Sequence, residues 1–265
     1  MQRNTLIRVL PAALLTLVVG FAAPCAPARA QGPMGMMMRG ASKIVNPATN
    51  AFGVLLARDD VKTELALSQM QNEQLTAEQT KGAQQMREKI MSNLPDFKAM
   101  ADLSDDERKS KMEEFQSKMK ETAEAGQAAM AQDMERKAAE ILRPEQMKRL
   151  KELDLQWRGP LALGDPKVAE KFALTKEQKP KTAAMLTDYQ KQQTETISAA
   201  FSGFKPGAGG PPDRTEMQAK MTKAQVDIEI LRKAQGEKVL PLLTEEQKTA
   251  WTAAQGKPFK FRKTE

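Results

Sequence analysis

The stretch Leu174–Gln178 reads LTKEQ, and Leu67–Gln71 reads LSQMQ about a hundred residues earlier in the chain. Their surroundings match too, because VKTELALSQMQ ending at Gln71 aligns without gaps on VAEKFALTKEQ ending at Gln178. A second pair, LRPEQ at Leu142–Gln146 and LTEEQ at Leu243–Gln247, follows in the same order. Self-similarity of this kind is typical of a repeated supersecondary unit. The sequence therefore predicts that one helical unit occurs twice.

Each stretch has the pattern of a helix capping box preceded by a leucine. Serine or threonine at the N-cap accepts a hydrogen bond from the amide three residues later, and glutamine there reaches back to the N-cap amide. Where Arg143 replaces the hydroxyl residue, Pro144 still favours a helix start. A fifth match, LTAEQ at 75–79, leaves open whether Ser68 or Thr76 begins the first long helix. The predicted capping positions are Leu67, Ser68, Gln71, Leu142, Gln146, Leu174, Thr175, Gln178, Leu243, Thr244 and Gln247.

A charge-rich helical chain whose units open and close with LTxxQ resembles the Spy/CpxP family of periplasmic stress proteins. The resemblance covers most of residues 51–265. It implies a hairpin-rich, all-α fold that forms a cradle-shaped homodimer, whose concave face binds unfolded proteins. Some members of the family regulate an envelope-stress sensor kinase, and others bind zinc, nickel or copper. A sensor-kinase periplasmic domain is therefore a second candidate partner.

Two units in one polypeptide depart from the homodimer that the resemblance implies. We therefore expect a monomer in which the two units form a covalent pseudo-dimer cradle. By count, residues 51–158 carry 18 basic and 21 acidic side chains, whereas residues 159–265 carry 18 basic and 13 acidic ones. Opposite net charges favour docking of the two halves. The alternative interpretation is that the charge difference between the halves arose by drift of solvent-exposed charged residues and has no role in docking.

Residues 1–30 have the pattern of a secretory signal peptide. Arg3 and Arg8 precede an apolar stretch, and Ala28-Arg29-Ala30 (residues 28–30) provides a small-x-small cleavage site. We expect cleavage after Ala30 and a periplasmic location, with no membrane-spanning segment. A lipidated start at Cys25 is the alternative. Cleavage after Ala30 removes the only cysteine, so the mature chain has no disulfide.

The first unit is expected to follow a Met- and Gly-rich flexible arm over residues 31–50. Asn46-Pro47 has the pattern of a helix start, with a short helix ending near Asp59. A helix of about 25 residues follows the first capping box. A box at 104–107 opens a helix that runs to about Ile141, some 50 Å long at 1.5 Å per residue. Pro144 then begins the closing helix, which ends before Gly159-Pro160.

The second unit, residues 159–265, repeats this order. Asp165-Pro166 begins a short helix, and Thr175 caps a long one. Residues 203–213, GFKPGAGGPPD, form a loop that cannot be helical. The return helix has apolar residues at spacings of four and three from Met217 to Leu231, and a last helix ends at Ala254 before a basic and aromatic tail.

The residue inventory argues against catalysis and against nucleic-acid binding. The chain has no histidine, which is the commonest general base and the usual zinc ligand. The pI of about 9.4 arises in part from the signal peptide, and the remaining charges alternate in sign along helices. Acidic pairs fall in helix first turns, where they complement the helix dipole. We therefore expect no catalytic residues and no cofactor.

Methionine is unusually frequent, with 17 in 265 residues. At helical spacing, methionine usually fills gaps in a core. Because its unbranched side chain re-packs easily, methionine also suits surfaces that bind many partners. Both interpretations stay open for the long helices. The candidates for client binding are Met112, Phe115, Met119, Met217 and Met221, with Lys118, Lys120, Lys220 and Lys223 beside them.

A second methionine cluster lies in the N-terminal arm, at Met34, Met36, Met37 and Met38. Thioether ligands select Cu(I) over harder ions. A copper-handling arm, and with it a metal or stress sensor, is the alternative to a featureless arm. The sequence thus favours a chaperone-like binding protein over a sensor or regulator.

Overall fold

The computed structural model describes residues 47–92, 104–201 and 214–262. Every regular element in these ranges is a helix, which confirms the expected all-α class. The signal peptide, the cluster from Met34 to Met38 and the loop at 203–213 lie outside the described residues.

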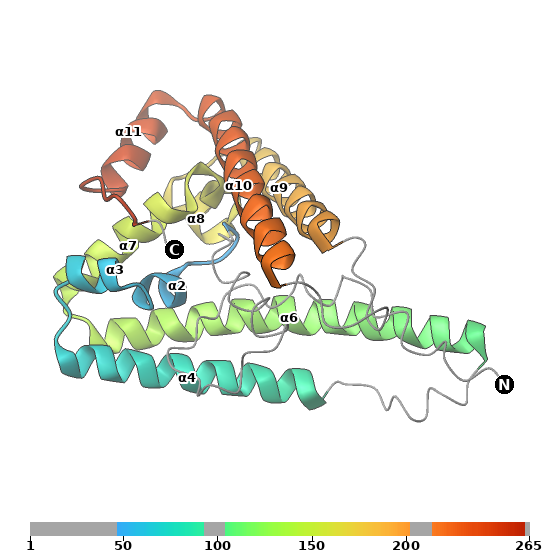
Figure 1. Cartoon of the computed structure of the whole chain (residues 1–265). Coiled ribbons are helices and arrows are strands. Elements are labelled where there is room, and N and C mark those ends of the chain that lie inside the picture. The colour runs from blue at the N-terminus through green and yellow to red at the C-terminus, as the bar shows by residue number, and fades with distance from the viewer. Residues whose placement is uncertain (1–46, 93–103, 202–213, 263–265) are drawn as a thin grey trace.

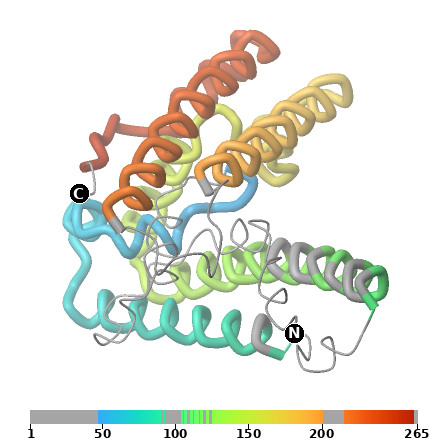
Figure 2. Tube along the Cα trace, turned by 45° about the vertical axis from the view of Figure 1, so that its right-hand side comes forward, coloured from blue at the N-terminus to red at the C-terminus, as the bar shows by residue number. Residues whose placement is uncertain are grey.

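The first half of the chain folds around an antiparallel pair of long helices, α4 and α6, which lie side by side (Figures 1 and 2). The Ser104 hydroxyl accepts the Glu107 amide and Glu107 caps the Ser104 amide, so α6 begins where its capping box predicts. The elements are α2 (Phe52–Leu56), α3 (Asp59–Glu64), α4 (Gln69–Ser92), α6 (Asp105–Ile141) and α7 (Pro144–Arg158).

The second half contains another long pair, α9 and α10, drawn in orange shades in Figure 1. Asp165 caps α8 through the Lys167 amide, and Thr244 caps α11 through the Gln247 amide. The elements are η2 (Pro160–Gly164), α8 (Pro166–Lys171), α9 (Gln178–Phe201), α10 (Arg214–Val239), η3 (Leu240–Leu242) and α11 (Glu245–Ala254).

Two hydrophobic clusters correspond broadly to the two halves. The first is built on fully buried leucines such as Leu55, Leu75 and Leu150. In the second, Tyr189 is fully buried and Phe172 meets Trp251 edge to face, with ring centroids 5.2 Å apart. Leucines dominate because they fill a helical interface without polar atoms to satisfy. Each cluster therefore consists mainly of residues from the helices of one half.

A buried arginine joins the two halves. Arg158, at the end of α7, is 2% exposed. Its Nη2 donates to Asp165 Oδ2 at 2.8 Å, and its Nη1 donates to Asp154 Oδ2 at 3.2 Å. The guanidinium also donates twice to the Pro47 carbonyl, at 3.0 and 2.6 Å. Because Asp165 belongs to the second half, this network lies across the expected boundary at residues 158 and 159.

Two details differ from the sequence expectations. The first short helix begins at Phe52 rather than at Pro47, because the Pro47 carbonyl is directed to Arg158 and the Ala51 amide donates to Asp154 Oδ1 at 2.6 Å. Residues 47–50 are thus held against the core, although they were expected to belong to the arm. Of the two starts that the sequence left open for the first long helix, Ser68 is the one that caps α4.

The C-terminal strap, residues 255–262, crosses back to the first half. The Phe259 amide donates to Gln156 Oε1 at 2.8 Å, and Phe261 meets Trp157 edge to face with centroids 4.8 Å apart. The Arg262 amide donates to Asp60 Oδ2 at 2.7 Å. The end of the second half therefore completes the hydrophobic cluster of the first.

Candidate functional site

The capping glutamines of the first half pair with each other across the hairpin base. Gln71 Nε2 donates to Gln146 Oε1 at 2.8 Å, and Gln146 Nε2 donates to Gln71 Oε1 at 3.2 Å. Gln71 also donates to the Ile141 carbonyl at 3.0 Å, and Gln146 donates to the Leu65 carbonyl at 3.0 Å. We call this pair the first glutamine clasp. It links the starts of α4 and α7 to the ends of α3 and α6.

The same arrangement recurs in the second half. Gln178 Nε2 donates to Gln247 Oε1 at 2.8 Å, and Gln247 Nε2 donates back to Gln178 Oε1 at 3.0 Å. Their remaining donors bind the carbonyls of Leu242, at 2.7 Å, and Ala173, at 3.1 Å. This second glutamine clasp joins the starts of α9 and α11 across the base of that hairpin.

The turns that lead into the clasps are also alike. Ala66 and Ala173 are the two residues other than glycine with positive φ in the described chain, at 47° and 50°. Each closes a short helix, α3 or α8, and leaves its carbonyl pointing at a clasp glutamine. The matched turns keep the backbone acceptors in place for the paired amides.

The expected client-binding residues do not form one exposed face. Phe115, Met217 and Met221 are buried, and the two methionines belong to the cluster between α9 and α10. The α10 residues with the predicted spacing of four and three therefore form the stripe of that helix that faces the core. The structure does not describe the side chains of Met112, Met119 and Lys120. Lys118, Lys220 and Lys223 are exposed and each pairs with an acidic residue one turn away on its own helix.

A different stripe of α10 is apolar and exposed. Val226 is 53% exposed and Ile230 is 61% exposed. They lie one helical turn apart, and Lys223 and Lys233 flank them at a spacing of three. We call this surface the α10 face. Sequence reasoning missed it because the heptad-like spacing assigned the apolar role to the neighbouring stripe, although the Val226–Ile230 pair itself was visible.

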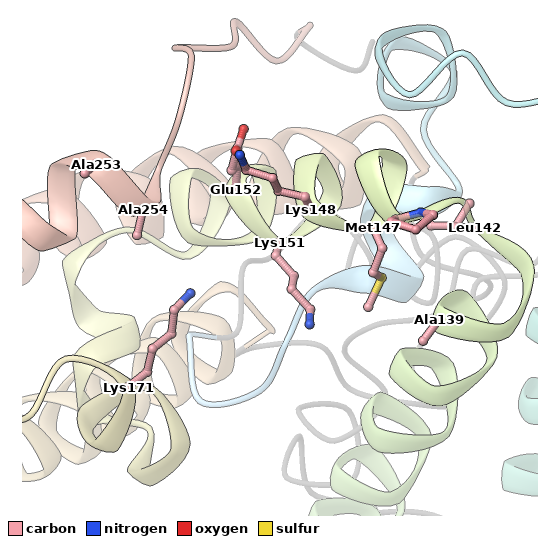
Figure 3. A pocket seen from close by; sticks show the side chains of 10 residues that line it. Ala139, Leu142, Met147, Lys148, Lys151, Glu152, Lys171, Ala253 and Ala254 are labelled. Carbon is pink, nitrogen blue, oxygen red and sulfur yellow. The ribbon is translucent and has the colours of Figure 1, made fainter.

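An open cleft of about 470 Å³ lies between the two halves (Figure 3). Lys148, Lys151 and Glu152 line it from α7, and Lys171 lines it from α8. Lys151 and Lys171 extend from the two helices into the same space (Figure 3). The apolar part of the lining is formed by Ala139, Leu142, Pro144, Met147, Ala253 and Ala254.

The charges of the cleft are unbalanced. Glu152 is held by Arg149, whose Nη1 lies 2.9 Å from Glu152 Oε2. Among the described residues, no acidic side chain forms an ion pair with Lys148, Lys151 or Lys171. The cleft therefore offers three exposed ammonium groups above an apolar lining.

The buried ionisable groups are fixed in structural roles. Burial raises the pKa of Asp154 above the usual range, although the charge of Arg158 and the Ala51 amide oppose the rise. Burial likewise raises the pKa of Tyr189. In the described ranges, no group of three or more His, Cys, Asp and Glu residues could hold a metal ion.

Comparison with protein-family models, with curated proteins and with solved structures gives no match for this chain. Within the described parts of the chain, no helix has the length and apolar character needed to cross a membrane.

Proposed function

We propose that the protein is an exported, ATP-independent chaperone-like protein that binds unfolded or misfolded envelope proteins. The observation that carries the proposal is the α10 face, where Val226 and Ile230 are both more than half exposed. Non-native chains expose apolar segments that native chains bury, and an exposed apolar stripe can bind such segments.

The paired clasps support a tandem arrangement for this function. In both halves, two glutamine side chains donate hydrogen bonds from Nε2 to each other's Oε1. We propose that the two hairpins are copies of one LTxxQ unit and form an internal pseudo-dimer cradle, as the resemblance to the Spy/CpxP family implies. The signal-like residues 1–30 support a periplasmic location for this protein.

A light-scattering assay with an aggregating client tests the proposal. Replacing both large apolar residues of the α10 face, V226S/I230S, is expected to abolish protection of the client. The melting temperature should change little, because substitutions of exposed side chains usually alter stability by less than about 0.5 kcal/mol.

Two control variants make the result specific. A219S/A234S changes two exposed alanines on the same helix and is expected to keep the protection. M217S/M221S changes buried residues and should lower stability, because removing a buried methionine costs about 2–5 kcal/mol. If V226S/I230S protects the client as well as the unchanged protein does, the α10 face is not the binding surface. If the unchanged protein protects no client, the chaperone proposal fails and a sensor or regulatory role takes its place.

A further inference from the structure

We propose that the cleft between the halves binds a short acidic peptide segment in which carboxylate and apolar side chains alternate. We call this the acidic-peptide site. It is separate from the α10 face and does not depend on it, since α10 contributes no residue to the cleft lining.

The positive charges come from both halves of the chain. Lys148 and Lys151 both belong to α7, where Lys148 extends toward Glu152 and Lys151 extends to the other side of the helix (Figure 3). Lys171 belongs to α8 and extends toward the same space as Lys151 (Figure 3). A carboxylate placed between these two lysines would therefore contact both halves at once.

Among the described residues, none of the three ammonium groups has a carboxylate partner, and that of Lys171 lies 5.5 Å from the centroid of the Phe172 ring. All three lysines are exposed, and the one carboxylate in the lining, Glu152, is already paired with Arg149. Elsewhere on the surface, lysines such as Lys118 and Lys223 are paired with carboxylates of their own helices. The cleft is thus electrostatically complementary to an anion.

The apolar lining distinguishes a peptide from a simple anion. Leu142 and Met147 are buried at the cleft, with Ala253 and Ala254 on the opposite side. A bare inorganic anion would leave this lining unused. In an extended peptide, successive side chains point to opposite sides, so carboxylates can meet the lysines while alternate apolar side chains meet the lining. Because the cleft is open, such a peptide can enter and leave it without a movement of the surrounding helices.

Fluorescence polarisation with a labelled peptide of alternating aspartate and leucine tests the proposal. The full mature chain should bind this probe, and K148Q/K151Q/K171Q should bind it at least about tenfold more weakly, because three charge contacts are lost. The matched control K81Q/K191Q/K238Q removes the same charge from exposed positions outside the cleft and should bind normally. Added salt should weaken binding through screening.

Three further results would overturn the assignment. The probe in which asparagine replaces aspartate should not bind; equal binding would show that carboxylates are not recognised. Octanoate or inorganic phosphate should compete poorly, and competition equal to that of the peptide would identify a small anion as the ligand. If the two triple-lysine variants lose equal peptide affinity, the effect arises from the net charge of the protein and not from the cleft. V226S/I230S should keep the peptide affinity, so failure of the chaperone proposal can be recognised separately.

Discussion

Gln178 and Gln247 hydrogen bond to each other in both directions, although 69 residues separate them in the chain. Each also accepts its own N-cap amide, from Thr175 at 2.8 Å and from Thr244 at 3.0 Å. All donor and acceptor positions of both side-chain amides are thereby used. The glutamine of LTxxQ thus has two tasks, one within its helix and one across the hairpin base.

Replacing Gln178 by glutamate separates these two tasks. The carboxylate of Q178E can still accept the Thr175 amide, but it cannot donate to Gln247 or to the Leu242 carbonyl. We expect Q178E to lose about 1–3 kcal/mol of stability, because Gln247 Oε1 and the Leu242 carbonyl are left without a donor. Q178A should lose more, because it also removes the acceptor of the Thr175 amide. Chemical denaturation measures the difference.

The capping box of α6 provides the matched control for Q178E. Glu107 caps the Ser104 amide at 3.1 Å and is exposed, and in the described part of α4, Gln69–Ser92, no glutamine is hydrogen bonded to it. E107Q should therefore change stability by less than about 0.5 kcal/mol. If Q178E is as harmless as E107Q, pairing across the hairpin contributes nothing to stability.

Arg158 is expected to be the most sensitive position at the junction of the two halves. R158M removes the partner of Asp154 and Asp165 and should destabilise the protein by about 3–5 kcal/mol, since it leaves buried charge uncompensated. Adding D154N and D165N to R158M should restore part of the loss. R136M, at an exposed arginine with two ion pairs on its own helix, should cost less than about 1 kcal/mol. Similar unfolding midpoints for R158M and R136M would contradict the proposed role.

The C-terminal strap should detach in acid. Burial opposes ionisation of Asp60, but hydrogen bonds from Arg58 and the Arg262 amide, together with the charge of Arg58, hold its pKa below the usual range. A carboxyl group with a lowered pKa stabilises the fold above its unfolded pKa, near 3.9, and loses that contribution as pH falls through its folded pKa. We therefore expect the strap to stay docked at neutral pH and to detach below about pH 4.

Trp157 fluorescence in a W251F background reports this detachment, because Phe261 packs against Trp157. In the D60N variant, the strap should already be loose at neutral pH, so the Trp157 fluorescence should not change below about pH 4. An identical acid transition in D60N would show that another group controls the strap.

Gly256 is expected to be intolerant of a side chain. Its φ is +62°, and a Cβ there would overlap the carboxylate of Glu152, which Arg149 holds in place. G256A should therefore cost about 1–2 kcal/mol from the backbone conformation alone. G82A is the control, because its Cβ would meet only the flexible end of Met130, at 3.2 Å, and alanine suits a helix interior. We expect G82A to be neutral or stabilising in thermal melts; a G256A melt no lower than that of G82A would contradict this account.

The helices could be predicted because their starts are local signals. Ser104, Asp165 and Thr244 cap helices where their patterns predict, and the repeated LTxxQ pattern also located the residues that form both clasps. The pairing of the clasp amides could not be predicted, because a capping box explains each glutamine by itself. Only the fold brings Gln71 and Gln146 together.

The long-range contacts of the C-terminal strap could not be predicted from the sequence either. The tail was visible as a basic and aromatic segment, but its docking on Trp157 depends on where α11 ends. Similarly, the choice between Met217 and Val226 as the exposed side of α10 depends on how that helix packs against α9, since both stripes are apolar in the sequence.

Site-specific photo-crosslinking to an unfolded client tests the central claim most directly. A photoreactive phenylalanine analogue in place of Ile230, on the exposed α10 face, should crosslink to the client efficiently. The same analogue in place of Lys191, an exposed residue of α9, should give little crosslinking. Efficient crosslinking at position 191 with none at position 230 would contradict the claim that the α10 face holds non-native polypeptides.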